Sequence, residues 1–335
     1  MKTIFRTLVL GLAAFALAAP QRALALEWGV CGHPFTQAGY TQISLKTQFS
    51  LMKELGATWY RDEWDESSYA NDPKRYVELV EQARHSGIQV LPILRPKRLG
   101  VDTDPQVVYS RAYAYGYSVA QATVGLARDY EIENELDGWS LNKGIKGNNG
   151  LKQSDYDSVR LSYSAAELRG LRDGVKAADP AAKTMIDFGW LHFGYVDAMV
   201  AQGVSFDILA WHYYAGDWFD NDCTRIPGFG DAWSKLRSYG RPIWVTECNH
   251  LNSSDDDPRE GAELANLARQ FQRLPNCEVA FVYELLDEPW VAKWAGQQEA
   301  WYGLVHTAVD ASGTVRMGDK KPAYDALKRA IAKVR

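Results

Sequence analysis

The chain has 335 residues, of which 37 are Lys or Arg and 42 are Asp or Glu, so its formal net charge is −5. This acidic balance disfavours nucleic acid and anionic lipid as partners, although it leaves room for a local basic patch. The length fits two average domains, but it also fits one α/β barrel, a fold that often runs this long as a single domain.

The first 25 residues have the layout of a secretory signal peptide. A basic start is followed by an apolar run over 7–19 and by the small-x-small sequence Ala23-Leu24-Ala25. The rival interpretation is an uncleaved membrane anchor, for which the apolar run is short. We therefore expect a signal peptide over 1–25, one folded domain over 26–335 with no further membrane span, and a secreted or periplasmic protein. Removal of Lys2, Arg6 and Arg22 would change the net charge from −5 to −8.

Short apolar runs alternate with longer amphipathic stretches along the rest of the chain. Near-continuous apolar runs are typical of parallel strands that are buried on both faces. The pattern predicts strands at 28–33, 57–61, 89–94, 129–134, 184–188, 206–212, 242–247 and 278–284. Helical patterns are expected at 47–55, 72–86, 154–178, 258–274 and 322–334.

The helix at 72–86 has the clearest end signals. Asp72 is a capping residue, Pro73 fits the first helical position and Gly87 follows the last turn. Strands that alternate with helices eight times predict the α/β class and a single (β/α)8 TIM barrel. The alternative is an open doubly wound sheet, but no GxGxxG or GxxxxGK[ST] motif follows an early strand, which disfavours its nucleotide-binding form.

Two polar stretches, 142–154 and 249–260, each follow a predicted strand and are expected to be loops that wall a cleft. The second contains Ser253-Ser254-Asp255-Asp256-Asp257. Such an acidic run could bind calcium, but it lacks the spacing of an EF-hand loop, so a solvated loop is the preferred interpretation.

The cysteines are Cys31, Cys223, Cys248 and Cys277, and export would permit disulfides in any of three pairings. A bridge between Cys223 and Cys248 would fix a loop near the end of the seventh strand and is one hypothesis. The other two cysteines could equally be buried free thiols. Because the chain has no CxxC pair and no Cys/His cluster with zinc spacing, a structural metal site is not expected. No organic cofactor is expected either.

Two segments, 130–135 and 242–247, each deliver a carboxylate at the end of a predicted strand. These carboxylates are Glu135 and Glu247. In a (β/α)8 barrel the catalytic groups sit at the C-terminal ends of the strands. Two carboxylates that face one another across a cleft are what glycoside hydrolysis requires. Glu133 is a weaker rival to Glu135, since alternation along an extended strand would place both on the same face.

The strand ends resemble glycoside hydrolase clan A, the retaining β-glycosidases built on (β/α)8 barrels. The matching residues are Asn134-Glu135 after the fourth strand, Glu247 after the seventh, His212-Tyr213-Tyr214 after the sixth and Arg61 after the second. Residues 299–305 and 321–324 also resemble clan members near family 39 and related bacterial exopolysaccharide hydrolases. The resemblance covers nearly all of 27–330 and implies that 26–335 is the catalytic domain.

The resemblance also implies a role for each residue. Glu135 would be the general acid/base and Glu247 the nucleophile, with the two carboxyl groups about 5–5.5 Å apart. The positive charge of Arg61 would keep the nucleophile ionised. The remaining positions would orient the nucleophile or bind sugar hydroxyls: Tyr214, Asn134 and His212.

Further sugar contacts are expected from aromatic side chains on the loops. The chain has 12 Trp and 18 Tyr, and flat aromatic faces match the apolar faces of pyranose rings, although most of these rings should be structural. Clan members often place an aromatic floor at the end of the eighth strand, and the Tyr283-Glu284 sequence found here departs from that pattern. The substrate-binding candidates are His33, Trp139, Trp218, Trp290 and Trp294, with Trp301 as a further stacking candidate.

The preferred interpretation is a retaining glycoside hydrolase that cleaves β-glycosidic bonds inside a polysaccharide, with an extracellular exopolysaccharide as the expected carbohydrate polymer substrate. Two alternatives remain open. One is an exo-acting, β-xylosidase-like glycosidase. The other is a non-catalytic polysaccharide-binding barrel in an export or assembly complex. The sequence indicates neither the sugar and linkage nor the oligomeric state.

Overall fold

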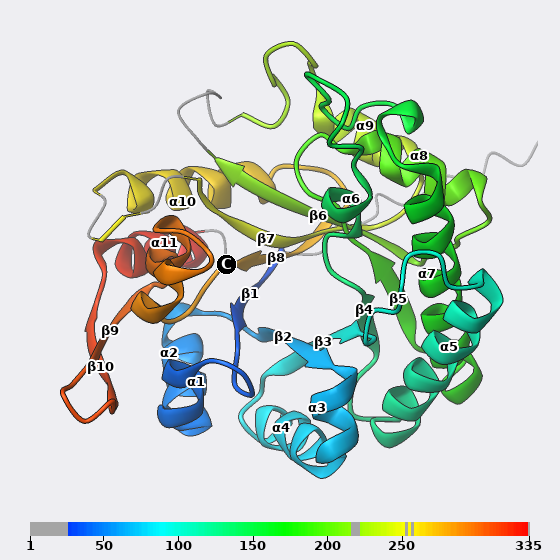
Figure 1. Cartoon of the computed structure of the whole chain (residues 1–335). Coiled ribbons are helices and arrows are strands. Elements are labelled where there is room, and N and C mark those ends of the chain that lie inside the picture. The colour runs from blue at the N-terminus through cyan, green and yellow to red at the C-terminus, as the bar shows by residue number, and fades with distance from the viewer. Residues whose placement is uncertain (1–25, 216–221, 252–253, 256–257, 334–335) are drawn as a thin grey trace, which may run out of the picture.

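The computed structural model describes residues 26–215, 222–251, 254–255 and 258–333. Eight parallel strands close into a barrel in chain order, and helices surround it (Figure 1). The fold prediction is therefore confirmed. The strands are β1 (Glu27–Gly32), β2 (Trp59–Asp65), β3 (Gln89–Arg95), β4 (Asp129–Ile132), β5 (Lys183–Ile186), β6 (Ile208–Ala215), β7 (Ile243–His250) and β8 (Cys277–Val282).

The elements outside the barrel are mostly helices. A hairpin of two antiparallel strands, β9 (Val305–Val309) and β10 (Val315–Lys320), follows β8. The α-helices are α1 (Ala38–Gln42), α2 (Leu45–Leu55), α3 (Glu66–Asn71), α4 (Pro73–His85), α5 (Pro105–Ala122), α6 (Leu136–Ser140), α7 (Ser158–Ala178), α8 (Phe193–Ala201), α9 (Ala232–Ser238), α10 (Pro258–Phe271) and α11 (Pro322–Ala332). The 3-10 helices are η1 (Gln153–Asp155), η2 (Pro289–Lys293) and η3 (Gln298–Trp301).

The barrel closes between its first and last strands, where Trp28 of β1 pairs in parallel with Ala280 of β8. Strand β7 shows why these runs become barrel strands, because every one of its residues is buried. A strand with helices on one face and the barrel interior on the other must be apolar or internally paired on both faces. Hydrophobic burial therefore selects the closed barrel.

The strands nearest the candidate catalytic residues differ from their predicted bounds. Strand β4 ends at Ile132, and the backbone then turns, with left-handed φ values of 73° at Glu133 and 50° at Glu135. The expectation that these two side chains share one strand face was therefore wrong. Strands β6 and β7 run three residues beyond their predicted ends, which carries Tyr214 and His250 into the sheet.

The helix signals at 72–86 are confirmed. Asp72 accepts a hydrogen bond from the backbone N–H of Arg75, Pro73 opens α4, and Gly87 follows the helix with φ 75°. The pattern did not predict α5, α8 or α9. Residues 113–117 of α5 read Tyr-Ala-Tyr-Gly-Tyr. This alternation has period two, which is typical of a strand, so the pattern does not indicate a helix.

All four cysteines are free and buried. The hypothesis of a bridge between Cys223 and Cys248 is therefore wrong. The thiol of Cys223 faces the side-chain oxygen of Gln270 on α10, at 3.9 Å, whereas Cys248 is held within β7.

Within the described ranges, no helix is long and apolar enough to cross a membrane. The predicted signal peptide over 1–25 lies outside the described residues.

Candidate active site

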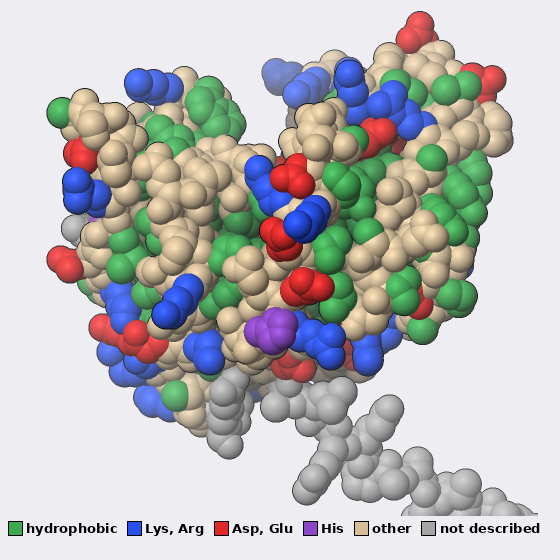
Figure 2. All heavy atoms as spheres, turned by 90° about the horizontal axis from the view of Figure 1, so that it is seen from below, with side chains coloured by type: hydrophobic (Ala, Val, Ile, Leu, Met, Phe, Trp, Pro, Cys, Tyr) green, Lys and Arg blue, Asp and Glu red, His purple; other side chains and the backbone are tan. Residues whose placement is uncertain are grey.

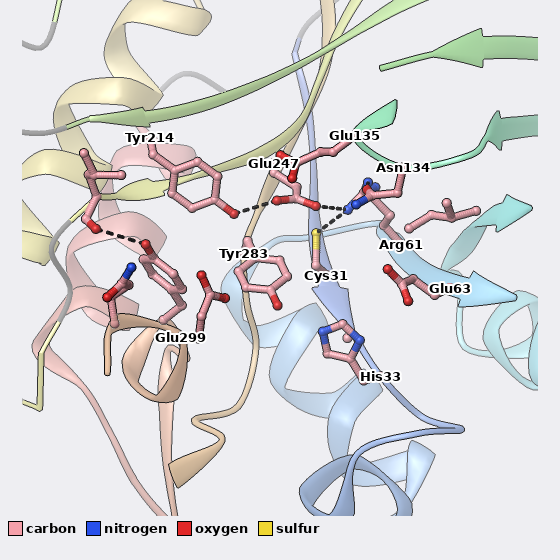
Figure 3. A pocket seen from close by; sticks show the side chains of 15 residues that line it. Cys31, His33, Arg61, Glu63, Asn134, Glu135, Tyr214, Glu247, Tyr283 and Glu299 are labelled. Atoms are coloured by element: carbon pink, nitrogen blue, oxygen red, sulfur yellow. Dashed lines mark hydrogen bonds and ion pairs between the residues drawn. The ribbon is translucent and has the colours of Figure 1, made fainter. Parts of the chain in front are cut away.

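Glu247 lies near the C-terminal end of β7, at the floor of a cavity, and both of its carboxylate oxygens accept hydrogen bonds. Arg61 donates from Nη1 to Oε1 at 2.6 Å, and the hydroxyl of Tyr214 donates to Oε2 at 2.6 Å (Figure 3). The two donors approach from β2 and β6. They fix the plane of the carboxylate and hold it at the surface of the cavity.

Arg61 is buried and binds a second carboxylate, that of Glu131, on β4. Its Nε lies 2.5 Å from Glu131 Oε2, and its Nη2 lies 3.1 Å from Oε1. Burial alone would lower the pKa of Arg61, but the charges of Glu131 and Glu247 raise it well above its usual range. Burial raises the pKa of Glu131, yet the Arg61 charge brings it down to about 2. Glu131 therefore anchors the guanidinium as a permanent anion.

Glu135 follows β4 and faces Glu247 across the cavity. Its side chain is 47% exposed, and its Oε1 lies 2.8 Å from Nδ1 of His212. One oxygen or nitrogen atom from each of Glu135, His212 and Glu247 lies within 4.8 Å of the other two. This spacing fits retaining glycosidases, whose carboxyl groups are about 5–5.5 Å apart, and is shorter than the roughly 6.5–9.5 Å of inverting enzymes.

His212 lies between acidic side chains and carries a charge. Burial would lower its pKa, but Glu247 and the hydrogen bonds to Glu131 and Glu135 raise it well above its ordinary value. Burial raises the pKa of Glu135, but the hydrogen bond and charge of His212 lower it by more, so the pKa lies below its usual range. His212 thus favours the ionised form of Glu135, the form that activates water.

Asp187, just beyond β5, is a site residue that the sequence analysis missed. Its carboxylate accepts the backbone N–H of Glu135 at 3.0 Å and lies 3.3 Å from Nε2 of His212. Burial raises the pKa of Asp187 well above its usual value, although His212 opposes the shift. Asp187 positions Glu135, whose left-handed backbone needs such support. Its position at the end of a strand is the feature of the sequence that could have identified Asp187 as a site residue.

Two neighbouring cavities share Glu135 and Tyr214. The first has a volume of about 260 Å³ and contains the carboxylates of both Glu135 and Glu247. The second, about 540 Å³, also includes Glu135 and is lined by Trp190 and His192. The residues of the first cavity are Cys31, Gly32, His33, Arg61, Glu63, Ile93, Asn134, Glu135, Tyr214, Glu247, Leu251, Tyr283, Gln298, Glu299 and Tyr302.

Glu299 on η3 is a further carboxylate of the first cavity, which also contains Glu63 of β2 (Figure 3). Burial, followed by the charges of Glu247 and Glu135, raises its pKa to about 7. The sequence analysis noted the motif at 299–305 without giving Glu299 a role. The segment lies far from the other site residues along the chain, so its position in the cavity could not be predicted.

The structure brings the predicted residues together around the two cavities: Asn134, Arg61, Tyr214 and His33 line the first, and His212 lines the second. Asn134 accepts a hydrogen bond from Arg61 at 2.7 Å. His33 lines the first cavity, and burial lowers its pKa to about 4, so its ring is neutral at neutral pH. The rival Glu133 is buried near Arg98, at 3.8 Å, and lines neither cavity.

The predicted tryptophans among the described residues line neither cavity. Neither cavity includes Trp139, Trp290 or Trp294, nor Trp301, and Trp218 lies outside the described residues. Two guanidinium groups, of Arg98 and Arg160, lie 4.6 and 5.5 Å from the ring of Trp139. Trp290 donates to Gln37 at 3.0 Å, and Trp294 is 71% exposed. Trp190 is the tryptophan that lines the second cavity.

The predicted loops contribute unequally. Leu251, from the stretch 249–260, lines both cavities, whereas no residue of 142–154 lines either one. The surface seen in Figure 2 is hollowed at its upper end between two raised parts, with acidic and basic side chains beneath the hollow.

The chain matches no protein-family model and no curated protein. Solved structures with a similar fold include a β-glucosidase from Thermotoga maritima, with 13% identity over 92% of this chain and 98% of that one and a TM-score of 0.64. A family 39 glycoside hydrolase from Bacteroides cellulosilyticus shows 16% identity over 92% and 64%, with a TM-score of 0.63. The AHE enzyme from Alicyclobacillus herbarius shows 12% identity over 92% and 98%, with a TM-score of 0.66. These similarities show a shared fold.

Proposed function

We propose that the protein is a retaining β-glycosidase in which Glu135 is the acid/base and Glu247 is the nucleophile. The observation that carries the proposal is the placement of these two carboxylates at strand ends, with oxygen atoms within 4.8 Å of each other. Arg61 and Tyr214 orient the nucleophile from either side. The β-glucosidase and the family 39 hydrolase with the same fold support this class of reaction.

The reaction is a double displacement. Glu247 attacks the anomeric carbon while Glu135 transfers its proton to the leaving oxygen, which gives a glycosyl ester on Glu247. Glu135 then removes a proton from water, and the water attacks the anomeric carbon and releases Glu247. The first step needs protonated Glu135, and a sugar that displaces water from the two cavities favours this neutral form by desolvation.

The two cavities support a substrate that extends on both sides of the cleaved bond. The smaller one holds the nucleophile and fits the sugar that becomes attached to it. The larger one begins at Glu135 and would hold the leaving part of the chain, with Trp190 as a contact surface. We therefore propose that the substrate is a polysaccharide cut internally, and that it is an exopolysaccharide met outside the cytoplasm.

The export proposal rests on residues 1–25, whose basic start, apolar run and Ala23-Leu24-Ala25 sequence are those of a signal peptide. N-terminal sequencing of the protein secreted by a host would show whether cleavage follows Ala25. Retention of the first residues in the mature protein would contradict the proposal.

Product release from a panel of plant and bacterial polysaccharides tests the function. The wild-type protein is expected to release oligosaccharides from one polymer, and Glu247→Ala is expected to release none while remaining folded. Monosaccharide as the sole product would instead indicate an exo-acting, β-xylosidase-like enzyme. A polymer that is retained on an affinity gel without being cut by the wild type would indicate a non-catalytic binding barrel.

A further inference from the structure

His33, Glu284 and Glu288 converge behind the wall of the first cavity. His33 follows β1, and the two glutamates follow β8, so the barrel closure brings them together. One ligand atom from each residue lies within 4.8 Å of the other two. The Nε2 atom of His33 is 3.5 Å from Oε2 of Glu284.

The two carboxylates of this cluster are buried and incompletely paired. Glu284 is 0% exposed and Glu288 is 2% exposed. Oε1 of each glutamate and Nε2 of His33 have no hydrogen-bond partner. No lysine or arginine of the described chain forms an ion pair with either carboxylate. Burying such groups is costly unless a cation or a proton compensates them.

Other groups of His, Asp and Glu in the described residues differ in this respect. The two groups that contain His212 share the guanidinium of Arg61. The group of Asp255, Asp287 and His306 has Lys321, whose Nζ lies 2.7 Å from Asp287. In each of these, a protein side chain already supplies positive charge. The His33 cluster has no such group among the described residues.

We propose that His33, Glu284 and Glu288 form a binding site for a divalent transition-metal ion, with Zn²⁺ as the best chemical match. One imidazole nitrogen and two carboxylates are a ligand set that zinc accepts, and a fourth position remains for water. Zinc bonds of about 2.0–2.2 Å in a tetrahedron place ligand atoms about 3.3–3.6 Å apart. The separation between His33 and Glu284 already has this value.

Tyr40 orients Glu284, one of the proposed ligands. Its hydroxyl donates to Oε2 of Glu284 at 2.7 Å and accepts the backbone N–H of Leu286 at 2.9 Å. Such outer contacts orient a ligating carboxylate. A bound ion would connect the end of β1 to the segment after β8 and hold His33 against the catalytic cavity. The site is separate from Glu135 and Glu247, so it does not depend on the proposed function.

The test is zinc binding by the full protein after treatment with a chelator and gel filtration. After Zn²⁺ is added to the metal-free wild type and the excess is removed by a second gel filtration, elemental analysis is expected to find about one equivalent of Zn²⁺, and the Tm should be about 5 °C above that of the metal-free protein. Glu288→Gln should lose both effects. Glu247→Gln, which changes the catalytic cavity instead, should keep both effects.

Glu288→Gln is expected to fold without metal, because it removes a buried carboxylate that lacks a partner. Three results would overturn the proposal. The first is the absence of bound metal and of any Tm shift with Zn²⁺, Mn²⁺ or Ca²⁺. The second is unchanged zinc binding in Glu288→Gln. The third is loss of binding in Glu247→Gln alone, which would place the ion in the catalytic cavity.

Discussion

At the residue scale, Arg61 organises the site. One guanidinium group contacts Glu131, Asn134 and Glu247, which belong to or follow β4 and β7. The planar guanidinium holds its N–H donors in fixed directions, so it can make these contacts at the same time. A lysine at this position would make fewer of these hydrogen bonds. The position of Glu247 relative to Glu135 therefore depends on the buried ion pair between Arg61 and Glu131.

Glu299 provides a pH-dependent prediction. Its pKa is about 7 in the folded protein and 4.5 ordinarily, so between these values the unfolded chain has lost a proton that the folded chain keeps. Stability therefore falls as pH rises through this window. Glu299→Gln should remove the penalty, which makes the variant more stable than the wild type by about 1–2 kcal/mol at pH 8 after allowance for solvent screening, and by much less at pH 4.

Thermal unfolding from pH 4 to pH 8 measures this difference. Glu81→Gln, on the exposed side of α4, is the matched control and should follow the wild type at every pH. A difference between Glu299→Gln and the wild type that stays constant across the range would show that the side chain does not titrate as described.

Sequence motifs predicted the residues that lie at strand ends, including Glu135, Glu247 and Tyr214. They could not predict Glu299 or Trp190, because these positions follow from loop paths rather than from strand order. Trp139, Trp290 and Trp294 line neither cavity, and Trp139 shows a physical reason. An aromatic ring beside a cleft can pack under arginine side chains, as Trp139 does, and the sequence does not distinguish this packing from a sugar-stacking surface.

At the element scale, α5 and α7 lie side by side on the outside of the barrel (Figure 1). Glycines on α7 permit this approach. A Cβ atom at Gly174 would lie 2.2 Å from the carbonyl oxygen of Tyr113 and 2.7 Å from the backbone nitrogen of Tyr117. Because both atoms belong to the backbone of α5, a side chain could fit only if the two helices moved apart.

Gly174→Ala should therefore destabilise the protein by about 1–3 kcal/mol, since overpacking outweighs the gain of roughly 1 kcal/mol in helix propensity. Chemical denaturation gives the free energy of unfolding. Gly138→Ala on α6 is the control, because a Cβ there meets nothing within 4 Å, and its stability should match or slightly exceed that of the wild type. Equal stability of the two variants would contradict close helix packing.

The elements themselves were predictable to different degrees. All eight barrel strands were predicted because continuous apolar runs are distinctive, although their ends were displaced by up to four residues. Helices with a capping residue and proline at the start, such as α4, were also predicted. Helix α5 was missed because tertiary packing against α7, rather than a clear amphipathic pattern, accounts for its composition. The hairpin β9–β10 has mostly exposed residues and gave no signal.

At the scale of the whole molecule, the closed barrel makes the chemistry possible. Parallel strands end at one face, so Arg61, Glu135, Tyr214 and Glu247 meet there although they are distant along the chain. The same fold occurs in glycosidases that share only 13–16% identity with this chain. The fold can thus be inferred from the order of apolar runs, whereas the substrate depends on loops and on small energy differences between sugars.

The most direct test of the central claim is rescue by azide on an activated aryl glycoside of the sugar that the wild type cleaves, because its good leaving group departs without protonation by Glu135. In Glu135→Ala, azide should attack the ester on Glu247 and give a β-glycosyl azide. In Glu247→Ala, it should enter the space left by the nucleophile and give the α-glycosyl azide. NMR of the products reads both configurations. The opposite assignment, or undiminished hydrolysis by either variant, would contradict the roles given to the two glutamates.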